Sequence, residues 1–153
     1  MAIFFGENMY KKILVPTDGT PLSEDVFAAA IDLARAIPGC QILGLSVIVP
    51  IHFSPFDGMS PATVQEHEKH LDSHAQKYVG MLKAVADKAG VPCEALVTKS
   101  PSPSSEIVRV AKDYGCDLIF MASHGRKGLN RLFLGSETQK VLAQSTVPVL
   151  VHK

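Results

Sequence analysis

Apolar and polar residues alternate along this chain between two kinds of segment. Short runs of β-branched and other apolar residues predict strands, and these runs lie at residues 12–17, 41–49, 93–98, 117–122 and 147–152. Between the runs, apolar positions recur every three or four residues and predict helices, at residues 22–37, 62–88, 104–114 and 136–144. Such regular alternation predicts a three-layer α/β fold, in which a five-stranded parallel sheet carries helices on both faces.

Turn and capping residues separate the predicted elements. Thr20 is a suitable helix N-cap, and Pro21 takes the first helical position, where its missing N–H has no partner to lose. Ser104, followed by Glu106, predicts the start of the third helix, although the capping box is incomplete. The segment 50–61 contains three prolines and a glycine, so we expect a loop there.

The 153 residues contain no repeat and no linker long enough to divide the chain, so we expect one domain over residues 10–153. Residues 1–9 are expected to form a flexible extension. Their apolar start ends at Gly6, has no basic residue, and is too short for a signal peptide or a membrane span.

The charge balance narrows the classes of partner. Fifteen Lys and Arg residues match fifteen Asp and Glu residues, so no basic excess favours nucleic acid. Cys40, Cys93 and Cys116 have neither zinc-finger nor CxxC spacing, and they lie beside predicted strands. We therefore expect buried free thiols, a reducing compartment and a cytoplasmic location, with no nucleic acid and no membrane as partner.

The strongest chemical signal lies in the connection between the fourth strand and the last helix. Gly125 and Gly128 permit backbone conformations in which several N–H groups converge on an anion. Gly135-Ser136 opens the last helix, whose amino end attracts negative charge, and Arg126 adds positive charge nearby. These features suit a polyphosphate, but the loop matches neither the Walker motif nor the GxGxxG fingerprint. From these residues alone, a tight connection without a ligand remains the alternative.

The expected topology places this loop beside the turn that follows the first strand. In open parallel sheets, ligands bind at the carboxyl ends of the strands, where the strand order reverses. Asp18, which ends the first strand, and the loop 123–135 are expected at that same edge. Asp18 is also a common turn residue, so a purely structural role is its alternative.

The loop resembles the nucleotide-binding motif of the universal stress protein family, which reads G-x2-G-x9-G-[S/T]. Ala122, Gly125, Gly135 and Ser136 stand at its four defined positions, with alanine in place of the first glycine. The resemblance continues over residues 15–18, 46–47, 117–119 and 147–151, and it covers the chain from Tyr10 onward.

The resemblance implies a strand order of 3-2-1-4-5, as in adenine nucleotide α-hydrolases, with ATP and Mg²⁺ at the switch point. Asp18 would contact the ribose or adenine, the backbone near Val47 would face the base, and the glycines and Ser136 would hold the phosphates. The implied nucleotide-binding residues are Pro16, Thr17, Asp18, Val47, Ala122, Ser123, His124, Gly125, Arg126, Gly135, Ser136 and Glu137. A negative φ at Ala122 would make its methyl group a minor intrusion, whereas a positive φ would weaken binding.

Members of the family pair through the last strand, so the resemblance also implies a homodimer with Val147, Val149 and Val151 at the contact. The implied function is an ATP-binding regulatory protein of the stress response. Its ATP hydrolysis would be slow or absent, because no water-activating base is evident, and we assign no catalytic residue. Two alternatives stay open: a dimeric interaction module that has lost nucleotide binding, and an ATP-using enzyme related to the nucleotide α-hydrolases.

Other candidate residues have structural explanations. His67, His70 and His74 share one face of the second helix at spacings that metal sites also use. They stand among charged residues, so we expect a solvated face and no metal site. His124 is expected to line the loop rather than to act as a base, because no acidic partner is evident beside it. The apolar residues Phe53, Phe56 and Met59 fit a lid over adenine, packing at the sheet edge, or packing in a dimer.

Overall fold

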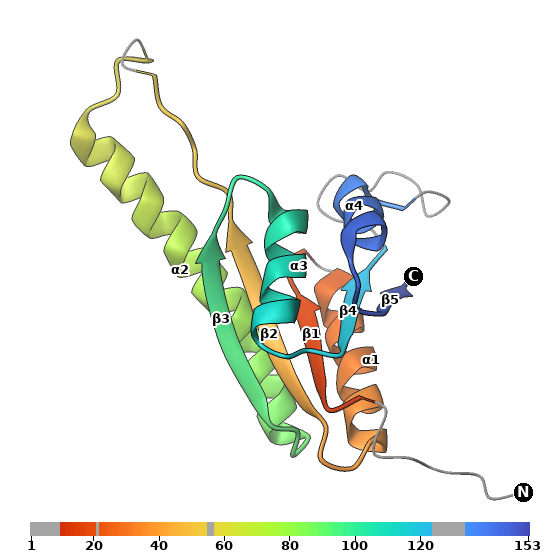
Figure 1. Cartoon of the computed structure of the whole chain (residues 1–153). Helices are drawn as coiled ribbons and strands as arrows, with labels where there is room; N and C mark the ends of the chain where they lie inside the picture. Colours follow the sequence, from red (N-terminus) through yellow and green to blue (C-terminus); the bar gives the residue numbers. More distant parts are fainter. Residues whose placement is uncertain (1–9, 21, 55–56, 124–133) are drawn as a thin grey trace, which may run out of the picture.

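The computed structural model of the protein describes residues 10–20, 22–54, 57–123 and 134–153. Five strands and four helices alternate along these residues, as the sequence predicts (Figure 1). The strands are β1 (Lys12–Pro16), β2 (Gln41–Ile48), β3 (Cys93–Lys99), β4 (Leu118–Ala122) and β5 (Val149–His152). The helices are α1 (Leu22–Ala36), α2 (Pro61–Lys88), α3 (Pro103–Asp113) and α4 (Ser136–Gln144).

The strands form one parallel sheet in the order β3-β2-β1-β4-β5. This order confirms the arrangement that the resemblance implies. β1 is central, with Leu14 opposite Leu43 of β2 on one side and opposite Ile119 of β4 on the other. The chain builds outward from β1 to β3 and then returns to the other side of β1, so the winding reverses between β1 and β4.

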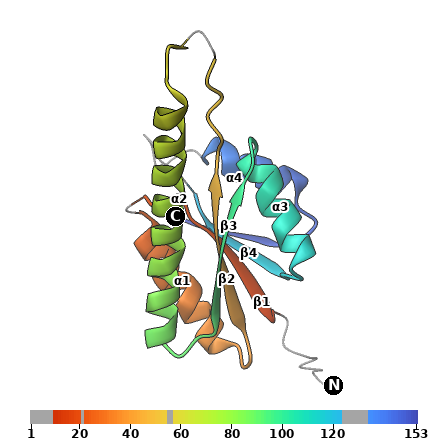
Figure 2. The same cartoon turned by 90° about the vertical axis from the view of Figure 1, so that its left-hand side faces the viewer.

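Helices cover both faces of the sheet, with α1 and α2 on one face and α3 and α4 on the other (Figure 2). Alternate residues of each strand supply the two cores. In β1, Ile13 and Val15 pack under α1 and α2, and Leu14 packs under α3 and α4. All three side chains are completely buried, because the central strand is covered on both faces.

Helix α2 packs closely on β2 because residue 44 has no side chain. A Cβ at Gly44 would lie 2.8 Å from Leu82 Cδ2 in α2, which is too short for a carbon–carbon contact. At its amino end α2 extends past the carboxyl edge of the sheet, together with the segment that follows β2 (Figure 1). Ser60 caps this end, since its Oγ accepts a hydrogen bond from Thr63 N at 3.2 Å.

The predicted ends of the elements differ from the observed ones by one or two residues. α3 begins at Pro103 with Ser102 as its N-cap, rather than at Ser104, because proline fits the first helical position. α2 likewise begins at Pro61. Pro21, the predicted first position of α1, lies outside the described residues.

The three cysteines are free and buried, as predicted. Burial raises the pKa of Cys93 and of Cys116 to about 11, so neither side chain is a reactive thiolate near neutral pH.

In the part of the chain that the structure describes, no helix is both long and apolar enough to cross a membrane.

Candidate functional site

The two central strands separate at their carboxyl ends. β1 is paired with β2 along its whole length. It is paired with β4 only at Ile13–Leu118 and Leu14–Ile119, although both strands run further. The sheet therefore opens between β1 and β4 at the point where its winding reverses. Parallel α/β sheets bind their ligands at such a point.

The turn after β1 is held by its own side chains. Thr17 N continues the pairing with β2 by donating to Leu45 O at 2.8 Å. Thr17 Oγ1 accepts from Gly19 N at 3.2 Å, and Asp18 Oδ1 accepts from Thr20 N at 3.1 Å. Asp18 thus has the turn role that its residue type suggests, and these bonds fix the carboxylate directly after the end of β1.

The ring of Tyr78 in α2 packs against the turn at Gly19. Gly19 has a φ of +73°, and the ring of Tyr78 lies where a Cβ at residue 19 would stand. His74 Nδ1 lies 3.4 Å from Tyr78 Oη, and the His74 ring centroid is 4.2 Å from that of His70. The turn is therefore fixed by packing as well as by hydrogen bonds.

The start of α4 is tied to the end of β4. Ser123 O accepts from Gly135 N at 2.7 Å, and Ser123 N donates to His152 O in β5 at 2.8 Å. Thr138, a buried residue in the first turn of α4, donates from Oγ1 to Ala122 O at 3.0 Å. These bonds hold the amino end of α4 beside the opening between β1 and β4.

The amino end of α4 has the properties of an anion site. Its first helical bond runs from Gln139 N to Gly135 O at 3.0 Å, so the N–H groups of residues 136–138 are those that a helix start leaves for an outside acceptor. These groups and the helix dipole favour negative charge. The N-cap Gly135 has φ −60° and ψ 152°, which any residue can adopt. Glycine at this position therefore provides space rather than a special conformation.

The first motif position accepts alanine without strain. Ala122 ends β4, and among the described residues none other than glycine has a positive φ. The methyl group therefore adds no conformational cost at the position where the family motif has glycine. Val47, in β2, is partly buried against the core beneath α3 and α4.

The carboxylate of Glu137 contacts α3. Oε2 accepts from Ser104 N at 2.9 Å, and Oε1 accepts from Lys140 Nζ at 2.9 Å. Burial acts to raise the pKa of Glu137, but the hydrogen bonds from Lys140 and Ser104 outweigh it and the net shift is downward. The side chain that the sequence assigned to nucleotide binding is thus ionised and bonded within the protein.

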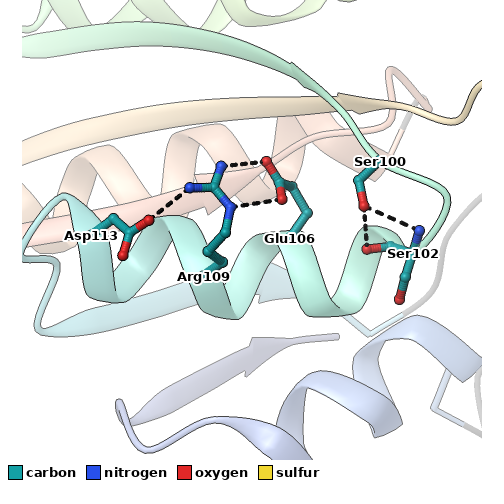
Figure 3. Close-up of polar contacts among 5 residues, drawn as sticks. All are labelled: Ser100, Ser102, Glu106, Arg109 and Asp113. Atoms are coloured by element: carbon teal, nitrogen blue, oxygen red, sulfur yellow. Dashed lines mark hydrogen bonds and ion pairs between the residues drawn. The ribbon is translucent and has the colours of Figure 1, made fainter.

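Polar contacts also lie just before α3 and along its exposed face (Figure 3). Ser100 Oγ accepts from Ser102 N and donates to Ser102 O, each at 3.2 Å. Arg109 donates to both oxygens of Glu106, at 2.6 and 2.9 Å, and to Asp113 at 2.7 Å. The bonds from Arg109 lower the pKa of Glu106 in spite of its burial. This network stabilises α3 and contains no group of the predicted site.

The structure brings the described members of the predicted nucleotide site to one edge of the sheet. They are Pro16, Thr17 and Asp18 at the end of β1, Val47 in β2, Ala122 and Ser123 at the end of β4, and Gly135, Ser136 and Glu137 at the start of α4. His124, Gly125 and Arg126 lie outside the described residues.

The three histidines of α2 do not converge. The rings of His70 and His74 contact each other at an interplanar angle of 48°, whereas His67 lies edge-on to Phe53 with 6.0 Å between ring centroids. Over the described ranges, no three His, Cys, Asp or Glu side chains are grouped so that they could hold a metal ion. The contact with His67 also shows Phe53 packed on α2.

Two contacts at this edge were not predicted from the sequence. Thr138 bonds α4 to β4. Its place in the first turn after the glycine motif is the sequence feature from which this contact could have been predicted. Tyr78 packs on Gly19 from a distant helix, and no local pattern indicates that contact.

The sequence profile of the universal stress protein family matches residues 9–153. The chain belongs to this family. It is 32% identical to universal stress protein MJ0531 of Methanocaldococcus jannaschii, over 97% of this chain and 85% of that protein. The solved structure of MJ0577, from the same organism, has a TM-score of 0.78 at 29% identity and covers 94% of this chain and 95% of that one.

A more distant family member shows the same fold. The universal stress protein of Archaeoglobus fulgidus, solved in complex with dAMP, has a TM-score of 0.64 at 18% identity, over 95% of this chain and 99% of that one. The architecture is therefore that of the universal stress proteins, an adenine nucleotide α-hydrolase type of fold with strand order 3-2-1-4-5.

In this universal stress protein, β5 is an edge strand, as the predicted dimer requires. Val147 and Val149 pack partly buried against the core beneath α3 and α4. The most exposed apolar side chain of the strand is Leu150, at 38%. Within the described residues, β4 is the one strand paired with β5, so its other side offers main-chain groups to a further strand.

Proposed function

We propose that this universal stress protein binds ATP at the opening between β1 and β4 and acts as a cytoplasmic regulatory protein. The phosphates bind the N–H groups of residues 136–138 and the glycines of the loop before them. The adenosine lies toward the turn at Asp18 and the backbone of β2 near Val47. Arg126, by its place in the motif, adds positive charge to the phosphate side.

One observation carries this proposal: the first turn of α4 is already fastened where the central strands part. The bonds Gly135 N–Ser123 O and Thr138 Oγ1–Ala122 O hold it there through contacts within the protein. Fixed N–H groups need no reorganisation when a phosphate arrives, which makes their contribution to binding larger. The dAMP complex of the Archaeoglobus fulgidus protein supports an adenine nucleotide as the ligand class.

Magnesium fits this site as a companion of the phosphates. The described residues contain no cluster of three carboxylates, histidines or thiols, so they form no cage for the ion alone. The Asp18 carboxylate and the Ser136 hydroxyl supply oxygen, the ligand atom that Mg²⁺ prefers. When bound, the ion neutralises phosphate charge.

We expect slow or no hydrolysis, because the Thr17 and Asp18 oxygens support the turn and no other base is assigned.

The proposed biological unit is a homodimer in which β5 pairs with β5 of a second copy. The strand lies at the edge of the sheet, and Leu150 exposes apolar surface beside the free main-chain groups. Pairing two such edges across a two-fold axis satisfies both sets of main-chain groups.

Calorimetric titration of the purified protein with ATP, with and without Mg²⁺, tests the proposal. We expect one site per chain, tighter binding with Mg²⁺, and phosphate release far slower than in an ATPase. A chain that binds no nucleotide under either condition but stays dimeric would instead be an interaction module. Rapid phosphate release would indicate an enzyme.

A further inference from the structure

Two helices of this sheet edge begin close together, and one carboxylate joins their first turns. We propose that Glu137 is a positioning residue that fills the amino end of α3 and thereby directs an incoming phosphate to the amino end of α4. The inference rests on the proposed nucleotide binding at α4, and it replaces the role of nucleotide ligand that the motif position suggests for Glu137.

The amino end of α3 depends on this carboxylate. Its N-cap, Ser102, makes no capping bond, because the Ser102 hydroxyl donates to Ser105 Oγ at 2.9 Å. Pro103 has no N–H, so Ser104 carries the first donor of the helix. Ser104 is completely buried, and its N–H donates to Glu137 Oε2 at 2.9 Å. A buried donor without an acceptor destabilises a fold, so Glu137 serves as the cap that Ser102 does not provide.

A second group at the same place also favours an anion. The Ser104 hydroxyl is completely buried, and its oxygen has no hydrogen-bond partner among the described residues, so it is a further donor for a nearby anion. Lys140 holds the other carboxylate oxygen from the exposed side. The negative charge at α3 is thus supplied from within the protein, by a residue of the first turn of α4.

This arrangement distinguishes the two helix starts. The amino end of α3 would otherwise attract a phosphate in the same way as that of α4. With Glu137 bonded to Ser104, α3 is filled and α4 keeps its orientation against α3 through the shared core residues Ile107, Val110 and Val141. If the Glu137 carboxylate had no such positioning role, it would only repel the phosphates. Its removal would then tighten ATP binding.

Three variants separate these roles: Glu137→Ala, Glu137→Gln and, as the matched control, Lys140→Gln. We expect Glu137→Ala to weaken MgATP binding about tenfold, because α4 loses its anchor on α3. Glu137→Gln retains an oxygen for Ser104 N and should stay within about threefold of the parent protein. Lys140→Gln removes only an exposed ion pair and should change the dissociation constant by less than about twofold. Glu137→Ala binding as tightly as the parent, or tighter, would overturn the proposal, and so would equal losses in the Ala and Gln variants.

A readout that does not need ATP keeps this test separate from that of nucleotide binding. In the parent protein, the NMR shift of the Ser104 amide should titrate with the Glu137 carboxyl as the pH falls, and in Glu137→Gln it should not. Inorganic phosphate should move the Ser104 amide in Glu137→Ala and leave it in place in the parent. A Ser104 amide that is indifferent to acid, or that responds to phosphate in the parent protein, contradicts the positioning role whether or not ATP binds.

Discussion

The carboxyl edge of the sheet has two halves with different linings. Over β2 and β3, the segment after β2 lies against the first half of α2. A small hollow there is lined by apolar residues such as Ile51, Phe53 and Leu71, and its other lining residues include His67, Glu68 and Lys99. Between β1 and β4, the edge presents main-chain groups and small polar side chains, among them Thr17 and Ser123. Both halves belong to the same sheet, and both end in loops before a helix.

The difference assigns separate tasks to the two halves. The apolar side chains over β2 and β3 stabilise the projecting part of α2 and offer no hydrogen bond to a ligand. The polar half keeps N–H groups at the start of α4 that the helix itself does not use. We therefore expect substitutions in the first half to change stability, and substitutions in the second half to change ATP binding.

The largest expected effect comes from filling the space at Gly135. Its φ and ψ suit valine, so Gly135→Val should fold normally while its side chain blocks the amino end of α4. We expect ATP affinity to fall about 100-fold or more, near 2.7 kcal/mol, as measured by calorimetry. Gly80→Val is the matched control, because a Cβ at this exposed position of α2 meets nothing within 4 Å. If Gly135→Val bound ATP as tightly as the parent protein, the phosphates would not bind at the amino end of α4.

Gly19→Ala should reduce the free energy of unfolding by about 2 kcal/mol, from a strained φ together with displacement of the Tyr78 ring. Gly39→Ala, with a φ of +76° and nothing within 4 Å, should lose only about 1 kcal/mol. The difference between the two variants in urea unfolding measures the support that α2 gives to the turn after β1. Equal losses of unfolding free energy in the two variants would mean that the Tyr78 ring moves aside without destabilising the protein.

Asp18→Ala should weaken ATP binding about tenfold, because the variant loses a ligand contact and the bond that shapes the turn. Asp57→Ala is its counterpart on the other half of the edge, where Asp57 Oδ2 accepts from Ser54 N at 2.7 Å. Calorimetry should find parent-like ATP affinity in Asp57→Ala. If both aspartates prove equally dispensable for ATP, Asp18 is a turn residue and no more.

Phe53→Ala should lower stability by about 1 kcal/mol and leave ATP affinity unchanged, because the ring packs edge-on to His67. Urea unfolding and an ATP titration on the same sample measure both quantities. A loss of ATP affinity with unchanged stability would instead make Phe53 part of a lid over the nucleotide.

The smallest effect should appear in acid, at Glu106. Its pKa is lowered in the folded state by Arg109, so the ionised form stabilises the fold above the ordinary carboxyl pKa of about 4.3. This contribution is lost as the pH falls through the lower folded value. The difference in unfolding free energy between the parent and Glu106→Gln should therefore be constant above about pH 5 and shrink below about pH 4. If the difference in unfolding free energy did not change with pH, the Glu106–Arg109 ion pair would not stabilise the fold.

Much of this architecture was predictable from the sequence, because continuous apolar runs such as residues 13–15 are typical of strands covered on both faces. The strand order came from the resemblance rather than from periodicity. The position of Asp18 and Gly135 at one edge of the sheet was predictable for a topological reason, since the carboxyl ends of parallel strands share one edge.

The remainder depends on contacts that no local pattern encodes. Glu137 contacts Ser104, which is 33 residues away in the sequence, whereas the family resemblance implied only a nucleotide-binding role for it. Ser102 replaced Ser104 as the N-cap of α3 because Pro103 fits the first helical position. The spacing of the histidines predicts one shared face of α2, but the His67 ring contacts Phe53, while the His70 ring contacts that of His74.

The most direct test of ATP binding at the polar half is an NMR titration of the parent protein with ATP and Mg²⁺. We expect saturable shifts of the amides of Ser136, Glu137 and Thr138, together with those of Asp18 and Gly19, and none at residues 51–53. Shifts confined to the apolar half over β2 and β3, or no shift at any amide of α4, would contradict this expectation.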